Sequence, residues 1–239
     1  EMLRSLVGSE MCIRDRPKII HYCWFGRNPL PQSAIKCINS WKKFFPDYEI
    51  KEWNEQNFDV NIIPYTSEAY QAKKYAFVSD YARMWVLYNY GGIYFDTDVE
   101  VIKPMKDIVE NGPFMGIESE SEHKSIVNPG LGLGFDKNNQ ICKKIVDLYH
   151  QSNLECKGYI VPFATKVLQE LELKKSNKVQ TLDGITIYPT EYFNPYNNLK
   201  GKLNITPNTR TIHWFDASWL SSWGKIKYQL GNFFRKILN

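Results

Sequence analysis

Two short motifs near the middle of the chain combine side chains that could do chemistry. The first is Ser79-Asp80-Tyr81-Ala82-Arg83, and the second is Asp96-Thr97-Asp98. An apolar run, Ile93 to Phe95, precedes the second motif and predicts a buried strand. Residues two apart on a strand point to the same side and lie about 6.5–7 Å apart, so both carboxylates could address one cation. Hard divalent ions such as Mn²⁺ or Mg²⁺ are held by carboxylates together with phosphate oxygens of a ligand.

Asp80 and Arg83 are three residues apart, so on a helix they would share a face. The planar Arg fork suits phosphate, and an Asp carboxylate can accept hydrogen bonds from sugar hydroxyls. For Asp80 and Arg83, the simpler alternative is a local ion pair that only stabilises the helix. For Asp96 and Asp98, it is a pair of solvated aspartates at the end of a strand. The apolar approach to Asp96 and the nearby Asp80/Arg83 pair favour a cation site.

Alternating strand and helix patterns predict the elements that position these motifs. Apolar residues over 18–25 and alternation over 48–53 predict strands, and helical spacing over 33–45 predicts a helix between them. Helical spacing over 67–90, ending at Gly91, predicts either one broken helix or two successive helices, and a predicted strand over 93–102 follows. This order predicts a single Rossmann-like α/β domain with one central sheet flanked by helices.

The overall composition limits the class of protein. The 239 residues are 43% hydrophobic and 15% aromatic, with a net charge of +4. This charge is too small and too evenly spread to predict nucleic-acid binding. The five Cys residues form no CxxC pair and no Cys/His cluster of the zinc type, so we expect a reduced, cytoplasmic protein.

The two ends of the chain differ from its centre. Residues 1–16 lack periodicity and resemble a translated transposase adaptor from sequencing-library preparation, so we interpret them as an artefact or a disordered leader. We assign 17–221 to the α/β domain. Residues 222–239 have apolar positions three and four apart together with Lys and Arg, which predicts a basic amphipathic helix. That helix could lie on an anionic membrane surface or dock on the domain, and the sequence leaves both open.

Three separated motifs together resemble the family 32 glycosyltransferases. SDYARMWVLYNYGGIYFDTDVEV is similar to the signature of that family, and PKIIHYCWFG is similar to its opening segment. Arg16 stands where the family has an Ile. Ile212 to Trp219 resembles its closing element, so the resemblance covers Pro17 to about Trp219. It implies a GT-A fold, a nucleotide-sugar donor and transfer with retention of anomeric configuration.

The resemblance, and a more distant one to the glucosyltransferase domains of clostridial cytotoxins, also implies roles for individual residues. Trp24 would flank the nucleotide base, Tyr94 would line the site, and Asn128 would face donor and acceptor. Asp80 and Arg83 would hold the donor sugar and phosphate. Asp96 and Asp98 would contact the ribose and the metal. His213, Ser218 and Trp219 would approach the diphosphate and the metal from the C-terminal side, with His213 as a third metal ligand. Trp24, Tyr94 and His213 could instead be ordinary core residues.

These observations predict a Mn²⁺- or Mg²⁺-dependent retaining hexosyltransferase that uses a nucleotide sugar, with UDP-sugars favoured. The expected acceptor is a saccharide or a lipid-linked oligosaccharide in capsular or other surface polysaccharide synthesis, on the inner face of the cytoplasmic membrane. One alternative is a non-catalytic carbohydrate-binding module, which would need neither metal nor Arg83. Another is a phosphatase with a DxD nucleophile, although such enzymes carry that motif on their first strand.

Overall fold

The computed structural model describes residues 16–120, 125–152, 160–198 and 200–216. The predicted leader up to residue 15, the predicted helix over 222–239, and Ser218 and Trp219 lie outside the described residues. The division of the chain at residues 17 and 222 therefore stays a prediction. Among the described residues, no helix is both long and apolar enough to cross a bilayer.

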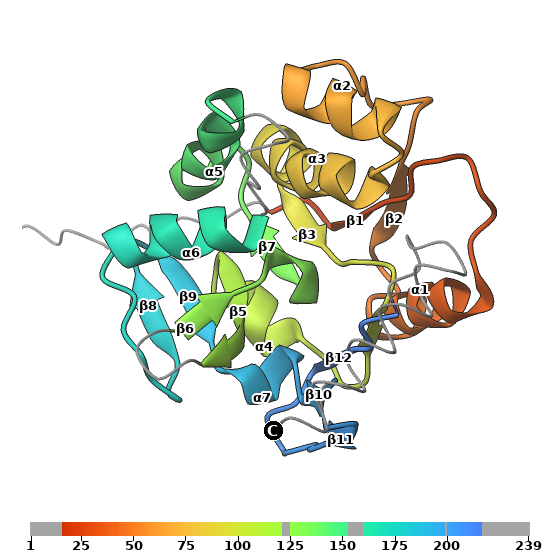
Figure 1. The fold of residues 1–239 in the computed structure, drawn as a ribbon. Helices are drawn as coiled ribbons and strands as arrows, with labels where there is room; N and C mark the ends of the chain where they lie inside the picture. The colour runs from red at the N-terminus through yellow and green to blue at the C-terminus, as the bar shows by residue number, and fades with distance from the viewer. Residues whose placement is uncertain (1–15, 121–124, 153–159, 199, 217–239) are drawn as a thin grey trace, which may run out of the picture.

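Helices and strands alternate through most of the described chain (Figure 1). The helices are α1 (Gln32–Phe44), α2 (Pro64–Gln71), α3 (Tyr75–Tyr90), α4 (Lys106–Glu110), η1 (Pro129–Leu131), α5 (Gln140–His150), α6 (Ile160–Glu170) and α7 (Thr190–Phe193). The strands are β1 (Ile19–Cys23), β2 (Glu49–Trp53), β3 (Gly92–Tyr94), β4 (Val99–Val101), β5 (Phe114–Glu120), β6 (Ser125–Val127), β7 (Leu133–Phe135), β8 (Gln180–Leu182), β9 (Ile185–Tyr188), β10 (Tyr196–Asn197), β11 (Lys202–Leu203) and β12 (Thr211–His213).

The central sheet is mixed, with strand order β2-β1-β3-β7-β5-β9-β8 and β6 paired to β5. Strand β1 lies between β2 and β3 and is parallel to both, whereas β7 is antiparallel to β3 and β5. Two small pairs, β10–β11 and β12–β4, lie outside this sheet. The prediction of a Rossmann-like mixed central α/β sheet flanked by helices is confirmed.

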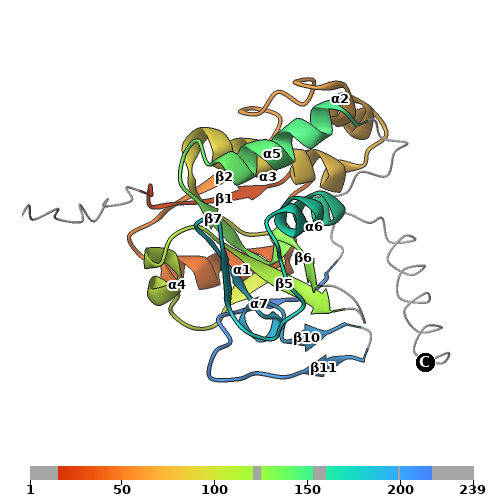
Figure 2. The same ribbon diagram turned by 90° about the vertical axis from the view of Figure 1, so that its left-hand side faces the viewer.

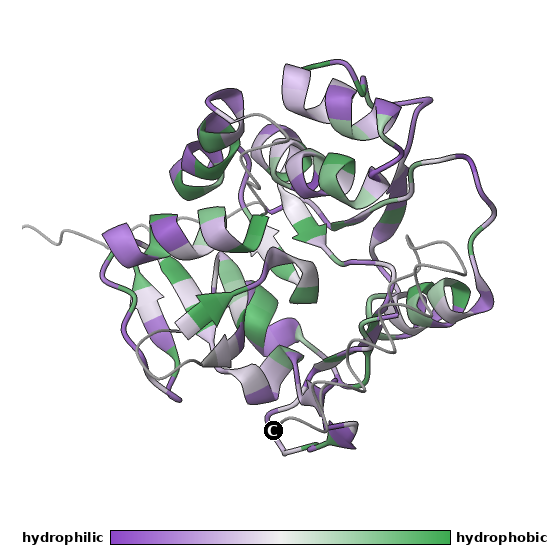
Figure 3. Ribbon diagram, in the orientation of Figure 1, coloured by the Kyte–Doolittle hydropathy of each residue, from purple (hydrophilic) through white to green (hydrophobic). Residues whose placement is uncertain are grey.

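Two layers of helices cover the two faces of the sheet, with α3 and α5 on one side and α1, α4 and α7 on the other (Figure 2). Strand residues divide between these layers in alternation: Ile20 and Ile93 pack with α1, whereas Cys23 and Tyr94 pack with α3. Figure 3 shows apolar and hydrophilic residues alternating along α1 and α5, as expected for helices with one buried face. The central strands are therefore packed against an apolar core on each face of the sheet.

Helix α3 ends where the sequence predicted, at Gly91. The Gly91 N–H donates to the Leu87 carbonyl, and the backbone there has φ +70°, which an L side chain adopts at a cost. A methyl group at this position would also lie 2.8 Å from the Lys137 backbone nitrogen. Glycine therefore allows the chain to reverse tightly from α3 into β3. The predicted helical stretch over 67–90 is two helices, one of the two arrangements that its pattern allowed.

Arg16, which we grouped with the leader, contacts the body of the fold. Its side chain is nearly buried and pairs with Asp136 at 3.0 Å, and it donates to the Val109 carbonyl at 3.2 Å. Arg16, the residue directly before Pro17, is therefore in contact with the folded domain.

Candidate functional site

Asp96 and Asp98 lie in a turn between two strands. Strand β3 ends at Tyr94 and β4 begins at Val99, whose N–H donates to the Asp96 carbonyl at 3.0 Å. The prediction of one strand over 93–102 is therefore wrong. The physical reason is that β3 belongs to the central sheet, whereas β4 leaves it to pair with β12. The two carboxylates converge because the backbone turns, not because of strand alternation.

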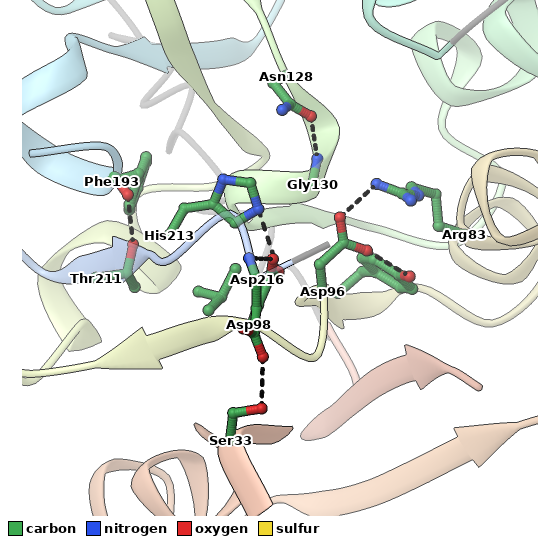
Figure 4. A network of polar contacts seen from close by, with 12 residues as sticks. Ser33, Arg83, Asp96, Asp98, Asn128, Gly130, Phe193, Thr211, His213 and Asp216 are labelled. Carbon is green, nitrogen blue, oxygen red and sulfur yellow. Dashed lines mark hydrogen bonds and ion pairs between the residues drawn. The ribbon is translucent and has the colours of Figure 1, made fainter. Parts of the chain in front are cut away.

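The Arg83 guanidinium joins the two motifs. Its Nη1 lies 3.1 Å from Asp96 Oδ2 (Figure 4). Its Nη2 lies 2.9 Å from Asp80 Oδ1. The Tyr94 hydroxyl donates to the other Asp96 oxygen at 2.9 Å. The predicted grouping of Asp80, Arg83, Tyr94 and Asp96 in space is thus observed.

Burial governs the electrostatics of this group. Only 5% of the Arg83 side chain is exposed. Burial alone would lower the pKa of Arg83, but Asp96, Tyr94 and Asp80 raise it well above its usual value. Burial raises the pKa of Asp80 to about 6 although Arg83 opposes that shift, and burial also raises the pKa of Asp96. One permanent cation is therefore shared by two carboxylates that are poorly solvated.

His213 reaches Asp98 from the far end of the described chain. It ends β12, which is antiparallel to β4 with His213 opposite Val99. Its Nε2 lies 3.1 Å from Asp98 Oδ1, and the Asp216 backbone N–H donates to Asp98 Oδ2 at 3.0 Å. Burial opposes both charges, but mutual attraction prevails: the pKa of His213 is raised and the pKa of Asp98 is lowered.

Asp96, Asp98 and His213 form a ligand set that fits a divalent cation. Each offers one ligand atom, and these atoms lie within 4.8 Å of one another. The 3.1 Å between His213 Nε2 and Asp98 Oδ1 is close to the roughly 3 Å that separates neighbouring ligands of an octahedral ion with bonds of about 2.1 Å. Two carboxylates and an imidazole suit Mn²⁺, and the carboxylates alone suit Mg²⁺.

Asn128 and Gly130 form a wall beside Asp96. The Asn128 side-chain oxygen accepts from the Gly130 N–H at 2.7 Å and so starts η1 (Figure 4). A methyl group on Gly130 would lie 2.3 Å from Asp96 Oδ2 and 3.1 Å from Arg83 Nη1. Backbone without a side chain therefore approaches the Arg83–Asp96 pair, and the Asn128 side chain lies beside it.

Trp24 lines a separate cavity of about 470 Å³ at the ends of β1 and β2. Its indole N–H donates to the Asn28 carbonyl at 2.6 Å. The other lining residues are mostly polar: Arg27, Asn28, Glu52, Asn54, Glu55 and Gln56. Because β1 is parallel to β3, this cavity lies at the same edge of the sheet as the turn that carries Asp96. Ligands of open α/β sheets bind outside this carboxyl edge.

Sequence reasoning missed two residues at the site. Gly130 had a sequence signal, since it stands in an Asn-Pro-Gly turn, but the closeness of its Cα to Asp96 depends on tertiary packing. Asp216 acts through its backbone N–H, which every residue except proline carries, so its residue type gives no signal.

Residues 31–115 match the model of a family described as a glycosyltransferase sugar-binding region containing a DXD motif. This segment is therefore similar to the DXD-containing regions of glycosyltransferases. The DXD region includes Arg83, Asp96 and Asp98, whereas Trp24 and Asn128 lie outside it. His213 also lies outside, so the third ligand of the cation set comes from beyond the matched segment.

Relatives of this chain include two curated proteins. Inositol phosphoceramide mannosyltransferase 1 of Schizosaccharomyces pombe is 27% identical over 110 residues, which cover 41% of this chain and 33% of the relative. Subversion of eukaryotic traffic protein A of Legionella pneumophila is 25% identical over 227 residues. This match covers 82% of this chain and 34% of the relative. This chain thus spans about a third of the length of either relative. Among solved structures, the PaToxG glycosyltransferase aligns with a TM-score of 0.49 and 22% identity, over 66% of this chain and 70% of that one.

Proposed function

We propose that this chain is a metal-dependent glycosyltransferase that moves a hexose from a nucleotide sugar to a saccharide or lipid-linked acceptor. The observation that carries this proposal is the convergence of Asp96, Asp98 and His213 within 4.8 Å, next to Arg83, in a chain with a DXD glycosyltransferase region. A solvated aspartate pair would require neither the imidazole nor the buried guanidinium.

The three ligands would hold Mn²⁺ or Mg²⁺ beside the diphosphate of the donor. When bound, such an ion supplies positive charge that stabilises the departing nucleoside diphosphate. Arg83 is anchored at both ends by Asp80 and Asp96, so its charge is fixed in place before the donor binds. A preorganised charge of this kind stabilises developing negative charge without a reorganisation cost.

The cavity beside Trp24 is suited to the nucleoside part of the donor. It combines one large aromatic face with amide and carboxylate groups that can accept or donate hydrogen bonds. The hydrogen bond from the Trp24 indole N–H to the Asn28 carbonyl restricts rotation of the Trp24 side chain. A base on the Trp24 ring and a diphosphate at Asp96 and Asp98 would place one ligand along the edge formed by β2, β1 and β3.

Retention of configuration is also part of the proposal. At the described site, Asp80 and Asp96 are paired with Arg83, and Asp98 is paired with His213. A carboxylate nucleophile would have to leave its partner unpaired in a buried place, at a cost of several kcal/mol. A same-face substitution, in which the leaving phosphate accepts the proton of the acceptor hydroxyl, needs no such rearrangement.

A UDP-hexose is the favoured donor, and a mannose donor should be tested beside it because one relative is a mannosyltransferase. Synthesis of a surface polysaccharide at the inner face of the cytoplasmic membrane would supply a lipid-linked acceptor.

Purified protein with Mn²⁺ should hydrolyse one sugar nucleotide from a panel of UDP- and GDP-sugars. Asp96→Asn and Asp98→Asn should each abolish this hydrolysis, and full activity in either variant, or no hydrolysis of any donor by the parent chain, would contradict the proposal.

A further inference from the structure

The 214–216 segment, which follows β12, fixes the orientation of Asp98. The Trp214 N–H donates to the Asp98 carbonyl at 3.0 Å, and the Asp216 N–H donates to Asp98 Oδ2 at 3.0 Å. With His213 on the other carboxylate oxygen, both oxygens of Asp98 are bonded to this part of the chain. A shift of the 214–216 segment would therefore rotate the Asp98 carboxylate.

The backbone of this segment is strained. Phe215 has φ +52°, a left-handed conformation that is costly for a residue with a side chain. This conformation lies between the two N–H groups that bind Asp98. Such a backbone persists only where surrounding contacts hold it. The Phe215 ring lies 4.1 Å from the His213 ring, centre to centre, which is one such contact.

Glu100 is one of two side chains that anchor the segment among the described residues, beside Ser33 of α1, whose hydroxyl donates to the Asp216 carboxylate. Its Oε2 accepts from the Trp214 indole N–H at 2.9 Å and from Lys36 Nζ at 3.0 Å. Only 17% of its side chain is exposed, and Lys36 Nζ lies 5.7 Å from the Trp214 ring centre. Glu100 therefore bonds the Trp214 side chain to β4, the strand that directly follows Asp98, and Lys36 ties both to α1.

We propose that Glu100 is a positioning residue for the cation site. By holding the Trp214 indole, it keeps the strained 214–216 backbone in the conformation whose N–H groups orient Asp98. The inference rests on the cation site of the proposed function. Groups that orient metal ligands typically contribute about 10–100-fold to metal affinity, and Glu100 acts one step further out, so we expect an effect of about tenfold.

Mn²⁺ binding to the purified chain, measured by calorimetry without any donor, tests this role. Glu100→Ala should weaken Mn²⁺ binding about tenfold, whereas Glu100→Gln, which keeps an acceptor for the indole, should stay close to the parent. Trp214→Phe should also weaken Mn²⁺ binding, and the loss in the double variant should be smaller than the sum of the two single losses, because both single variants remove the hydrogen bond between the indole and the Glu100 carboxylate. Glu110→Ala is the matched control, since Glu110 forms an exposed ion pair with Lys106 on α4.

Unfolding in urea should show that each variant is folded at the temperature of the titration. Parental Mn²⁺ affinity in both Glu100→Ala and Trp214→Phe would overturn the inference while leaving the proposed function intact. An equal loss in Glu100→Gln and Glu100→Ala would also overturn it, because charge and not the indole contact would then be responsible. If the parent chain binds no Mn²⁺, the cation site fails, and the role of Glu100 fails with it.

Discussion

His213 and Asp98 face each other from two antiparallel strands, with 3.1 Å between Nε2 and Oδ1. The contact joins the turn after β3 to the last described strand. Because a cation site needs ligands held in a fixed relative position, pairing of β4 with β12 is a condition for the site. The small β4–β12 pair, which lies outside the central sheet, is thus the element that completes the ligand set.

Replacing His213 should separate cation binding from folding. His213→Ala removes one of three ligands, so we expect Mn²⁺ affinity to fall at least tenfold, as measured by calorimetry. His150→Ala is the control, because His150 ends α5 on the exposed surface. Equal Mn²⁺ affinity in His213→Ala and the parent would exclude His213 as a ligand.

Gly130→Ala should lower activity through a steric effect on Asp96. The added methyl would lie 2.3 Å from Asp96 Oδ2, so the carboxylate must move away from Arg83. We expect kcat for donor hydrolysis to fall by about tenfold or more, because small displacements at a site are costly. Gly184→Ala serves as control: its methyl meets no atom within 4 Å, but φ +79° makes it costly to stability. A Gly130→Ala variant with parental kcat would contradict the placement of this wall.

Removal of Arg83 should destabilise the whole fold. Arg83→Ala would leave Asp80 and Asp96 without their shared cation in a buried place, which we expect to lower the free energy of unfolding by about 3 kcal/mol. Urea unfolding measures this loss. Lys143→Ala breaks an exposed pair with Asp147 and should change stability by less than about 1 kcal/mol. Similar stability losses in the two variants would show that the Arg83 pairs are solvated.

His21 should make the stability depend on pH. Burial lowers its pKa to about 4 from 6.5, and its ring lies between the Gly91 carbonyl and the Trp53 indole. Between these values the unfolded chain binds the proton more strongly, so stability is lost as pH falls from 6.5 toward 4, by about 3 kcal/mol in all.

The matched variant for this prediction is His21→Gln, which keeps a donor and an acceptor but does not titrate. The difference in unfolding free energy between parent and variant should shrink or reverse in sign toward low pH. A difference that stays constant from about pH 7 to pH 4.5 would show that His21 is not buried in its neutral form.

The sequence was sufficient to predict the elements whose pattern is local. The strand over 48–53 and the end of α3 at Gly91 follow from alternation and from a glycine pair. The i,i+3 contact between Asp80 and Arg83 follows from helix geometry. These features depend on residues close in the chain, so side-chain type and spacing determine them.

The parts that the sequence did not predict depend on distant chain segments. The turn at Asp96 was predicted as a strand because the pairing of β4 with β12 cannot be inferred from alternation in 93–102. The role of Glu100 depends on the meeting of Trp214 and Lys36, which are far apart in sequence. The motif types predicted which residues to consider for the candidate site, whereas the contacts that support these residues required the fold.

Coupled binding of Mn²⁺ and a nucleoside diphosphate tests the central claim most directly. UDP and GDP are titrated into the parent chain with and without Mn²⁺, and the same titrations are made with Asp98→Asn. The account predicts that one nucleotide binds at least tenfold more tightly with Mn²⁺ and that Asp98→Asn removes this gain, because the cation joins the diphosphate to the carboxylates. Equal nucleotide affinity with and without Mn²⁺, or an undiminished gain in Asp98→Asn, would contradict it.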